Sequence, residues 1–181
     1  MILIMKSTEH DKDSKIALTM VFVVYVIILV YFLLFAEDFD RDVTSLDYRY
    51  NLIPFKEIAR YLNNSEVFGI GGVLLNIAGN VVVFIPFGFL IAILHKVFRK
   101  VHVSIFAAAA FSAIMETLQL LTKVGSFDVD DIILNTLGGL LGLIAFFILR
   151  PIYVKHRNML DKKYAGDDED VDDVLRIDED K

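Results

Sequence analysis

Four long apolar blocks decide what this chain can fold into. The blocks cover residues 16–36, 73–94, 103–121 and 132–149, and each is 18 residues or longer. A helix needs about 20 apolar residues to cross the hydrocarbon of a bilayer. Within lipid, every backbone N–H and C=O must find a partner inside the chain, and a helix provides one for each. The sequence therefore predicts an all-α integral membrane protein built as a four-helix bundle.

The composition agrees with a single membrane domain of 181 residues. Hydrophobic residues make up 56% of the chain and the mean hydropathy is +0.57, above the average of soluble proteins. The chain has no cysteine, which excludes disulfides, thiolate metal sites and a cysteine nucleophile. Residues 165–181 carry a net charge of −7, from nine acidic and two basic residues. We expect this acidic tail to be disordered.

The lysines and arginines of the short loops fall into two unequal sets. Eleven lie before the first block, between the second and third, or after the fourth as far as residue 163, whereas five lie in the other two loops. Because cytoplasmic loops carry the excess of basic residues, both termini are predicted to be cytoplasmic. The first block is longer than a signal-peptide core and no cleavage site follows it, so we expect it to be retained. The predicted segments are a cytoplasmic N-terminal segment (1–15), a transmembrane anchor (16–36), an extracellular segment (37–72), a three-helix core (73–149) and a cytoplasmic acidic tail (150–181).

The extracellular segment contains the pattern of one short helix. Apolar residues recur at Phe55, Ile58, Ala59 and Leu62, the spacing of a helical stripe. Pro54 suits the first turn of such a helix. We therefore expect a short interfacial helix on the outer leaflet, followed by a flexible glycine turn over 69–72 that leads into the second block.

Polar residues interrupt three of the blocks, each time on one helical face near the predicted outer end. Because successive helices run in opposite directions, these faces lie at a similar depth and are expected to converge in one hydrated niche. With Asn51 and Asp128 from the outer loops, they form the predicted ligand-binding set. The set consists of Asn51, Asn76, Asn80, Glu116, Gln119, Asp128, Asp130, Asp131 and Asn135. Gly138 and Gly142 form a GxxxG pattern, which predicts a close approach of the fourth helix to a neighbour.

Two interpretations of these polar residues compete. Glu116 and Gln119 can serve as hydrogen-bonding contacts between helices, but an ionisable residue inside the membrane is by default a functional hypothesis. Asp130 and Asp131 can cap the start of the fourth helix. A cluster of these aspartates with Asp128 can also bind a hard divalent cation. The ligand set is incomplete, so our prediction is no metal and no cofactor.

Several motifs, in this order, resemble the VanZ-like family of bacterial membrane proteins. They are NLIPF at 51–55, NIAGN at 76–80, FIPFGF at 84–89, ETLQ at 116–119, GSFDVDD at 125–131 and NTLGG at 135–139. The resemblance covers residues 51–149. It implies a bacterial cell membrane. It also implies an association with resistance to the lipoglycopeptide teicoplanin, as for the namesake of the family.

Two functions follow as hypotheses. In the first, the outer-facing polar pocket binds a lipid-linked cell-wall precursor or the lipoglycopeptide itself and lowers susceptibility to teicoplanin-type antibiotics. In the second, the chain is an intramembrane enzyme acting on a lipid-linked envelope substrate, with Glu116, Asp128 and Asp131 as candidate acid–base groups or cation ligands. The expected partner in both cases is the lipid bilayer, with no nucleic acid. Whether the chain forms an oligomer is not predicted.

Overall fold

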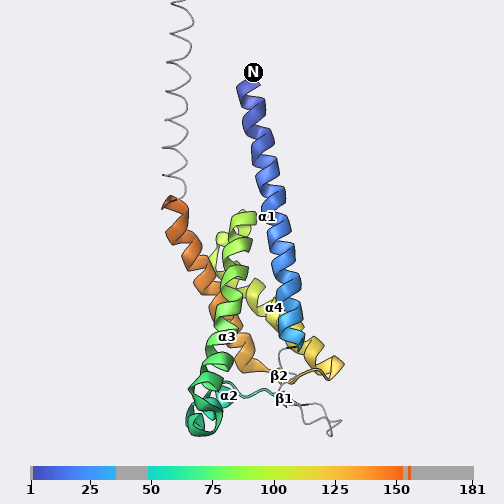
Figure 1. Ribbon diagram of the computed structural model, residues 1–181, viewed down its shortest axis with the longest axis vertical. Coiled ribbons are helices and arrows are strands. Elements are labelled where there is room, and N and C mark those ends of the chain that lie inside the picture. The colour runs from blue at the N-terminus through green and yellow to red at the C-terminus, as the bar shows by residue number, and fades with distance from the viewer. Residues whose placement is uncertain (1, 36–48, 153–154, 156–181) are drawn as a thin grey trace, which may run out of the picture. The chain divides into compact units, whose positions relative to one another are not determined.

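The computed structural model describes residues 2–35, 49–152 and 155. Among the described residues, those up to 144 belong to one unit and those from 145 to a second. The elements are α1 (Ile2–Phe35), β1 (Tyr50–Asn51), α2 (Lys56–Asn63), α3 (Ser65–Leu94), the 3-10 helix η2 (Lys96–Arg99), α4 (Val101–Thr122) and β2 (Phe127–Asp128) (Figure 1). A last helix follows β2 directly and runs over Val129–Ile152.

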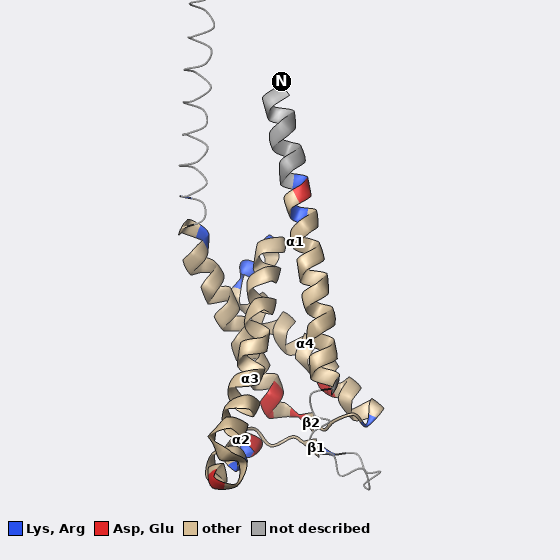
Figure 2. Ribbon diagram, viewed as in Figure 1, with Lys and Arg blue, Asp and Glu red and all other residues tan. Residues whose placement is uncertain are grey.

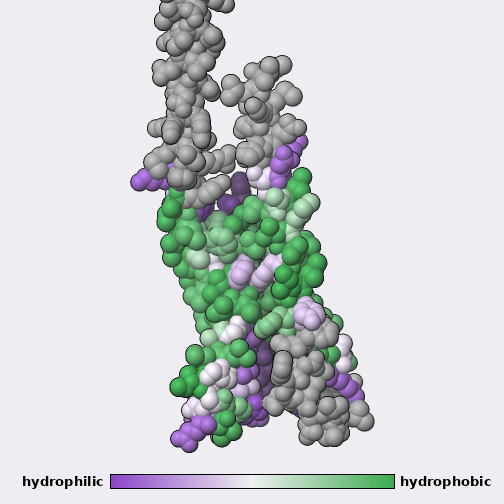
Figure 3. Space-filling model, in the orientation of Figure 1, coloured by the Kyte–Doolittle hydropathy of each residue, from purple (hydrophilic) through white to green (hydrophobic). Residues whose placement is uncertain are grey.

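Four helical stretches of the described chain are long and apolar enough to cross a membrane. They are Lys12–Leu34, Ser65–Leu94, Val101–Thr122 and Val129–Ile152. Large apolar side chains on these helices are exposed, such as Leu75 at 74% and Phe106 at 74%, and apolar side chains cover much of the visible face in Figure 3. An apolar exterior of this kind suits a lipid bilayer. The predicted all-α membrane bundle is confirmed.

The helices extend beyond the apolar blocks that predicted them. α1 begins at Ile2, and α3 begins at Ser65, because polar residues outside the hydrocarbon can continue a helix that hydropathy does not detect. The glycine turn expected over 69–72 is wrong for Gly71 and Gly72, which are helical. Only Gly69 leaves the helix, with φ 67 and ψ 160. Residues 36–48 and the acidic tail lie outside the described residues, so what was predicted for them stays a prediction.

The core of the first unit lies between α1, α3 and α4. Leu29 and Leu33 of α1 pack in one buried cluster with phenylalanines of α3 and with Met115 of α4. The Tyr25 hydroxyl of α1 donates a hydrogen bond to the Val83 carbonyl at 2.6 Å. This bond satisfies a polar group that would otherwise face hydrocarbon.

Glycines bring the last helix into backbone contact with α3. A Cβ added at Gly138 would lie 2.1 Å from the Val81 carbonyl oxygen, and one added at Gly142 would lie 2.0 Å from that of Ile85. A Cβ at Gly88 would lie 1.9 Å from the Gly139 oxygen. These distances leave no room for any side chain, so the predicted close approach at the GxxxG pattern is confirmed.

A two-stranded parallel pair, not predicted from the sequence, completes the fold. Tyr50 of β1 lies opposite Phe127 of β2, and Asn51 lies opposite Asp128. Figure 1 places β1, β2 and α2 together at one end of the unit, where α1 and α4 finish and the last helix begins. We call this the cavity end. Because strands of two residues have no measurable alternation, hydropathy patterns could not detect them.

Candidate functional site

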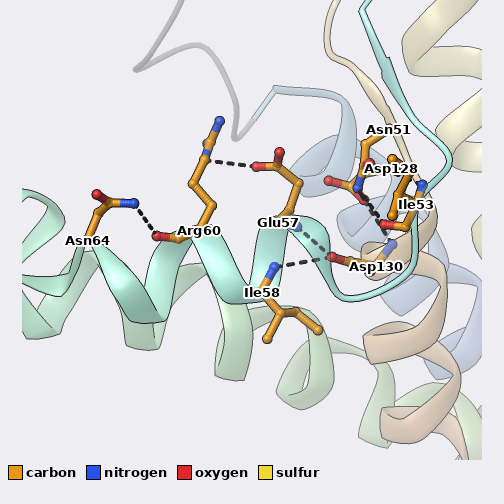
Figure 4. A network of polar contacts seen from close by, with 8 residues as sticks. All are labelled: Asn51, Ile53, Glu57, Ile58, Arg60, Asn64, Asp128 and Asp130. Atoms are coloured by element: carbon orange, nitrogen blue, oxygen red, sulfur yellow. Dashed lines mark hydrogen bonds and ion pairs between the residues drawn. The ribbon is translucent and has the colours of Figure 1, made fainter.

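The strand pair joins Asn51 to Asp128 at the cavity end, although 77 residues separate them. The Asn51 side-chain amide donates to the Asp128 carboxylate at 3.0 Å, and the Asn51 oxygen accepts the Ile53 N–H at 3.2 Å. The Asp128 N–H in turn donates to the Glu116 carboxylate of α4 at 2.9 Å. Figure 4 shows Asn51, Ile53 and Asp128 in contact. Glu116 thus holds β2 in place, and β2 holds Asn51.

Asp130 caps a helix that is not its own. Its carboxylate accepts the backbone N–H group of Phe55. It also accepts the backbone N–H groups of Glu57 at 2.8 Å and of Ile58 at 3.1 Å (Figure 4). Those N–H groups open α2 and have no partner within that helix. Asp128 serves as the cap of the last helix, because its Oδ1 accepts the Asp130 N–H at 2.8 Å. Of the two aspartates that could cap the start of the last helix, Asp130 therefore caps α2 instead.

The other predicted residues form hydrogen bonds to one another or to backbone carbonyls of the helices. The Asn80 amide donates to the Asp131 carboxylate, which ties α3 to the last helix. The Gln119 amide donates to the Leu33 carbonyl at 2.8 Å, so the ends of α4 and α1 are joined. Asn76 is exposed and donates to its own helix, at the Gly72 carbonyl.

These residues surround a cavity of about 470 Å³. Eight of the nine predicted ligand-binding residues line it, and Asn135 does not. The eight are Asn51, Asn76, Asn80, Glu116, Gln119, Asp128, Asp130 and Asp131. Asn135 is instead buried between helices, where its amide donates to the Ser112 hydroxyl of α4 at 2.8 Å. The convergence of the polar faces that helical spacing predicted is therefore present.

Part of the cavity wall was missed by sequence reasoning. The missed polar residues come from the strand and helix outside the apolar blocks and from the loop before β2. They are Arg49, Tyr50, Lys56, Glu57, Arg60, Tyr61 and Ser126. The strong amphipathic pattern of α2 predicts a helix with a polar face, but the pattern alone does not indicate that this face contributes to a cavity wall.

Charge is arranged unevenly around this wall. The three basic residues that line it, Arg49, Lys56 and Arg60, are all exposed. None of the five acidic lining residues is exposed, and Glu116 and Asp130 are only 2% and 1% exposed. Figure 2 shows the acidic segments beside β2 and α2. The cavity therefore has a cationic rim and an acidic interior.

A family model described as VanZ/LLP1 matches residues 22–150 of this sequence, which is more than half of the chain. The chain belongs to the VanZ/LLP1 family. It is also similar to Protein VanZ of Enterococcus faecium, with 30% identity over 95 residues. That match covers 52% of this chain and 58% of the relative, so the chain spans less than two thirds of the protein it matches. No solved structure matches the chain.

The residues that carry the resemblance to VanZ divide into two groups. Most of the polar ones, such as Asn80, Glu116 and Asp128, line the cavity, although Asn135 does not, whereas Gly88 and Gly138 allow the backbones of α3 and the last helix to touch. Gly79 belongs to neither group, because a Cβ added there would meet nothing within 4 Å. The motifs of this VanZ-like core thus describe both a cavity and the close helix packing beneath it.

Among the acidic residues that line the cavity, Asp128 has a raised pKa. Burial raises the pKa of Asp128 above its ordinary value, and the nearby acids Asp130 and Glu57 raise it further. The N–H of Asp130 and the Asn51 amide oppose this rise in pKa. Asp128 consequently holds a proton more readily than a free aspartate does.

The arrangement does not favour a divalent cation. Within the part of the chain that the structure describes, no three His, Cys, Asp or Glu side chains are grouped as metal ligands. The oxygens of Asp128 and Asp130 instead accept N–H donors from the backbone and from Asn51. A hard cation would have to compete with those donors for the same oxygens.

Proposed function

We propose that the cavity opens to the outside of a bacterial cell membrane and binds a lipid-linked cell-wall precursor or a lipoglycopeptide. Binding there lowers susceptibility to teicoplanin-type antibiotics. The observation that carries this proposal is one cavity of about 470 Å³ whose wall combines amides and carboxylates with exposed apolar residues of membrane-spanning helices. Both proposed ligands are amphiphiles, and an amphiphile needs both kinds of wall.

The volume and chemistry of the wall support this assignment. Ligand pockets commonly have volumes of roughly 300–1,000 Å³, and the amides of Asn76 and Asn80 offer donors and acceptors that suit a sugar or peptide headgroup. The outward orientation is supported by the excess of basic residues in the loops at the opposite ends of the helices. Membership of the VanZ/LLP1 family and similarity to Protein VanZ of Enterococcus faecium support a VanZ-like membrane protein.

The test fills the cavity without cutting the bonds that build it. Asn76→Trp introduces a large ring at an exposed lining position whose only described hydrogen bond is to the Gly72 carbonyl one turn earlier. The matched control is Thr117→Trp, because Thr117 is also exposed, also bonds one turn back, to Ala113, and does not line the cavity. Teicoplanin susceptibility is measured in a sensitive Gram-positive host that expresses each variant at equal membrane levels.

We expect wild type and Thr117→Trp to raise the inhibitory concentration of teicoplanin and Asn76→Trp to lose most of that increase. Equal protection by both variants would remove the cavity from the mechanism. Protection by none of the three proteins would contradict the proposed function of this chain.

An intramembrane enzyme is the alternative, and the raised pKa of Asp128 favours it. A carboxyl with a raised pKa keeps its proton to a higher pH than a free aspartate does, and in its protonated form it can act as a general acid toward a substrate in the cavity. Asp128→Asn preserves an acceptor oxygen for the bonds to Asn51 and Asp130 while removing the acid. If the chain is an enzyme, mass spectrometry of extracted lipid precursors will show a modified species with wild type that disappears with Asp128→Asn. An identical lipid profile with and without the wild-type chain counts against catalysis.

A further inference from the structure

We infer, on the basis of the proposed function, that the ligand is a phosphate-bearing lipid that enters the cavity sideways from the bilayer. Its phosphate lies against Arg49, Lys56 and Arg60, and its headgroup beyond the phosphate extends toward the acidic interior. The inference makes a choice among the proposed ligands, because it requires a phosphate and a lipid chain on the same molecule.

The first support is the separation of charge in the cavity wall. The lining contains three basic and five acidic residues, so its formal charge is −2 and total charge alone would repel an anion. The basic and acidic lining residues differ in solvent exposure. Every lining cation is exposed, whereas Glu116, Asp128 and Asp130 are at most 9% exposed. Several acids are also occupied by N–H donors of the chain, as with the three that Asp130 accepts from the start of α2. A phosphate at the rim would therefore meet cations first.

The second support is the way Arg60 is held at the rim. Its Nε lies 3.0 Å from the Glu57 carboxylate, and its guanidinium carbon lies 5.1 Å from the ring centre of Tyr61 and 5.7 Å from that of Phe68. A guanidinium has five N–H donors, and the pair with Glu57 uses the one on Nε. A side chain fixed in this way can donate from its terminal nitrogens to a phosphate at a reduced entropic cost.

The third support is an apolar flank in the same wall. Phe32 of α1 and Leu75 of α3 line the cavity, and they are 49% and 74% exposed although both belong to membrane-spanning helices. Exposed apolar side chains on spanning helices suit contact with lipid chains, and the inference places lipid beside these two. The cavity is thus bordered by lipid on one side and by rim cations on another, as a lipid with its chain left in the bilayer requires.

The polar residues of the cavity interior indicate which chemical groups the ligand carries beyond its phosphate. Beyond the rim, the wall presents carboxylates and amides, such as Asp131 and Asn80, which are partly exposed to the cavity. Carboxylates accept hydrogen bonds and do not donate them when ionised. The group attached to the phosphate should therefore be rich in hydroxyl, amide or ammonium donors, such as a sugar or a short peptide.

The experiment measures binding to the purified full chain in detergent by native mass spectrometry. The probes are a polyprenyl monophosphate, the polyprenol without its phosphate, phosphatidylglycerol, inorganic phosphate and teicoplanin. We expect the polyprenyl phosphate to bind at least about tenfold more tightly than the alcohol or inorganic phosphate, as the loss of one charge-assisted contact predicts. Arg49→Gln and Arg60→Gln should each weaken its binding about tenfold, and the exposed Lys96→Gln, in η2 and not in the cavity wall, should not.

Each outcome decides a separate point. Equal binding of phosphatidylglycerol would support recognition of a phosphate lipid and identify bulk lipid as its source. Equal binding of polyprenol, or an equal loss in Lys96→Gln, would overturn the inference. If teicoplanin binds to the wild type and not to Asn76→Trp, while no phosphate lipid binds, the inference fails and the proposed function stands. If no probe binds, both fail.

Discussion

Replacing Asp130 should release the start of α2 and leave the membrane-spanning helices in place. One carboxylate accepts three backbone N–H groups there, at Phe55, Glu57 and Ile58. Removing a helix N-cap costs about 0.5–2 kcal/mol, and hydrogen bonds to charged acceptors contribute about 1.5–3 kcal/mol. Water can reach the released groups at the cavity end, so we expect a net loss of about 2 kcal/mol for Asp130→Ala. A loss of this size corresponds to about a 30-fold increase in the open population of α2.

The backbone of Phe55 adds to this effect. Phe55 precedes α2 with φ 64, a left-handed conformation that costs roughly 1–2 kcal/mol for a residue with a side chain. The hydrogen bond from its N–H to Asp130 helps to hold it there. Once that bond is lost, the residue can relax to negative φ and take the first turn of α2 with it.

Hydrogen exchange of the full chain in lipid nanodiscs tests this reasoning. Amides 55–63 should exchange about 30-fold faster in Asp130→Ala, because local opening controls their exchange. Asp131→Asn is the control, since the Asp131 carboxylate accepts the side-chain amide of Asn80 in α3, and it should leave these amides unchanged. Unchanged exchange of 55–63 in Asp130→Ala, or an equal acceleration in both variants, would refute the capping role.

Three further predictions concern packing, pH and orientation. Gly138→Ala should lower the melting temperature in detergent by several degrees, because its Cβ would lie 2.1 Å from the Val81 oxygen. The control Gly79→Ala should be neutral or slightly stabilising. Equal effects of the two substitutions on the melting temperature would argue against the backbone contact. Asp128 has a folded pKa above its ordinary value, so its contribution to stability is fully present below that ordinary value and is lost as the pH rises through the raised one. Asp128→Asn should therefore flatten the decline in melting temperature over this acidic range, and an unchanged pH profile would contradict the burial argument. Cysteines placed at 54 and 127 in this cysteine-free chain should react with an impermeant thiol reagent added outside cells, and those at 98 and 160 should not; the reverse pattern would invert the predicted orientation.

The sequence was sufficient for the helices and for most of the polar wall. Four apolar blocks and the spacing of Asn80, Glu116 and Asp131 depend only on helical geometry and alternating direction, and the structure brings these residues to one cavity. The roles of individual residues were not readable in this way. The sequence left open whether Asp130 or Asp131 caps the last helix, and the three N–H donors that Asp130 binds belong to a segment 72–75 residues away.

The rest of the wall depends on contacts that leave no periodic signal. The pairing of Asn51 with Asp128 involves two residues on each strand, and the bond from Gln119 to the Leu33 carbonyl uses a backbone atom that every residue has. Rim cations such as Arg49 looked like ordinary loop charges, because nothing in their spacing ties them to helices far along the chain. Local pattern predicts elements, whereas only the tertiary fold decides which loops meet.

The β1–β2 pair sets the order in which this protein can mature. Strand β1 is synthesised 77 residues before its partner, and β2 itself precedes the last helix, whose first turn supplies Asp130 and Asp131. A nascent chain that has inserted α1 and α3 into the bilayer therefore still lacks the part of the cavity wall that Asp128, Asp130 and Asp131 form. A chain truncated upstream of residue 127 would lack β2 and the last helix, so the complete cavity can form only after that helix has been synthesised.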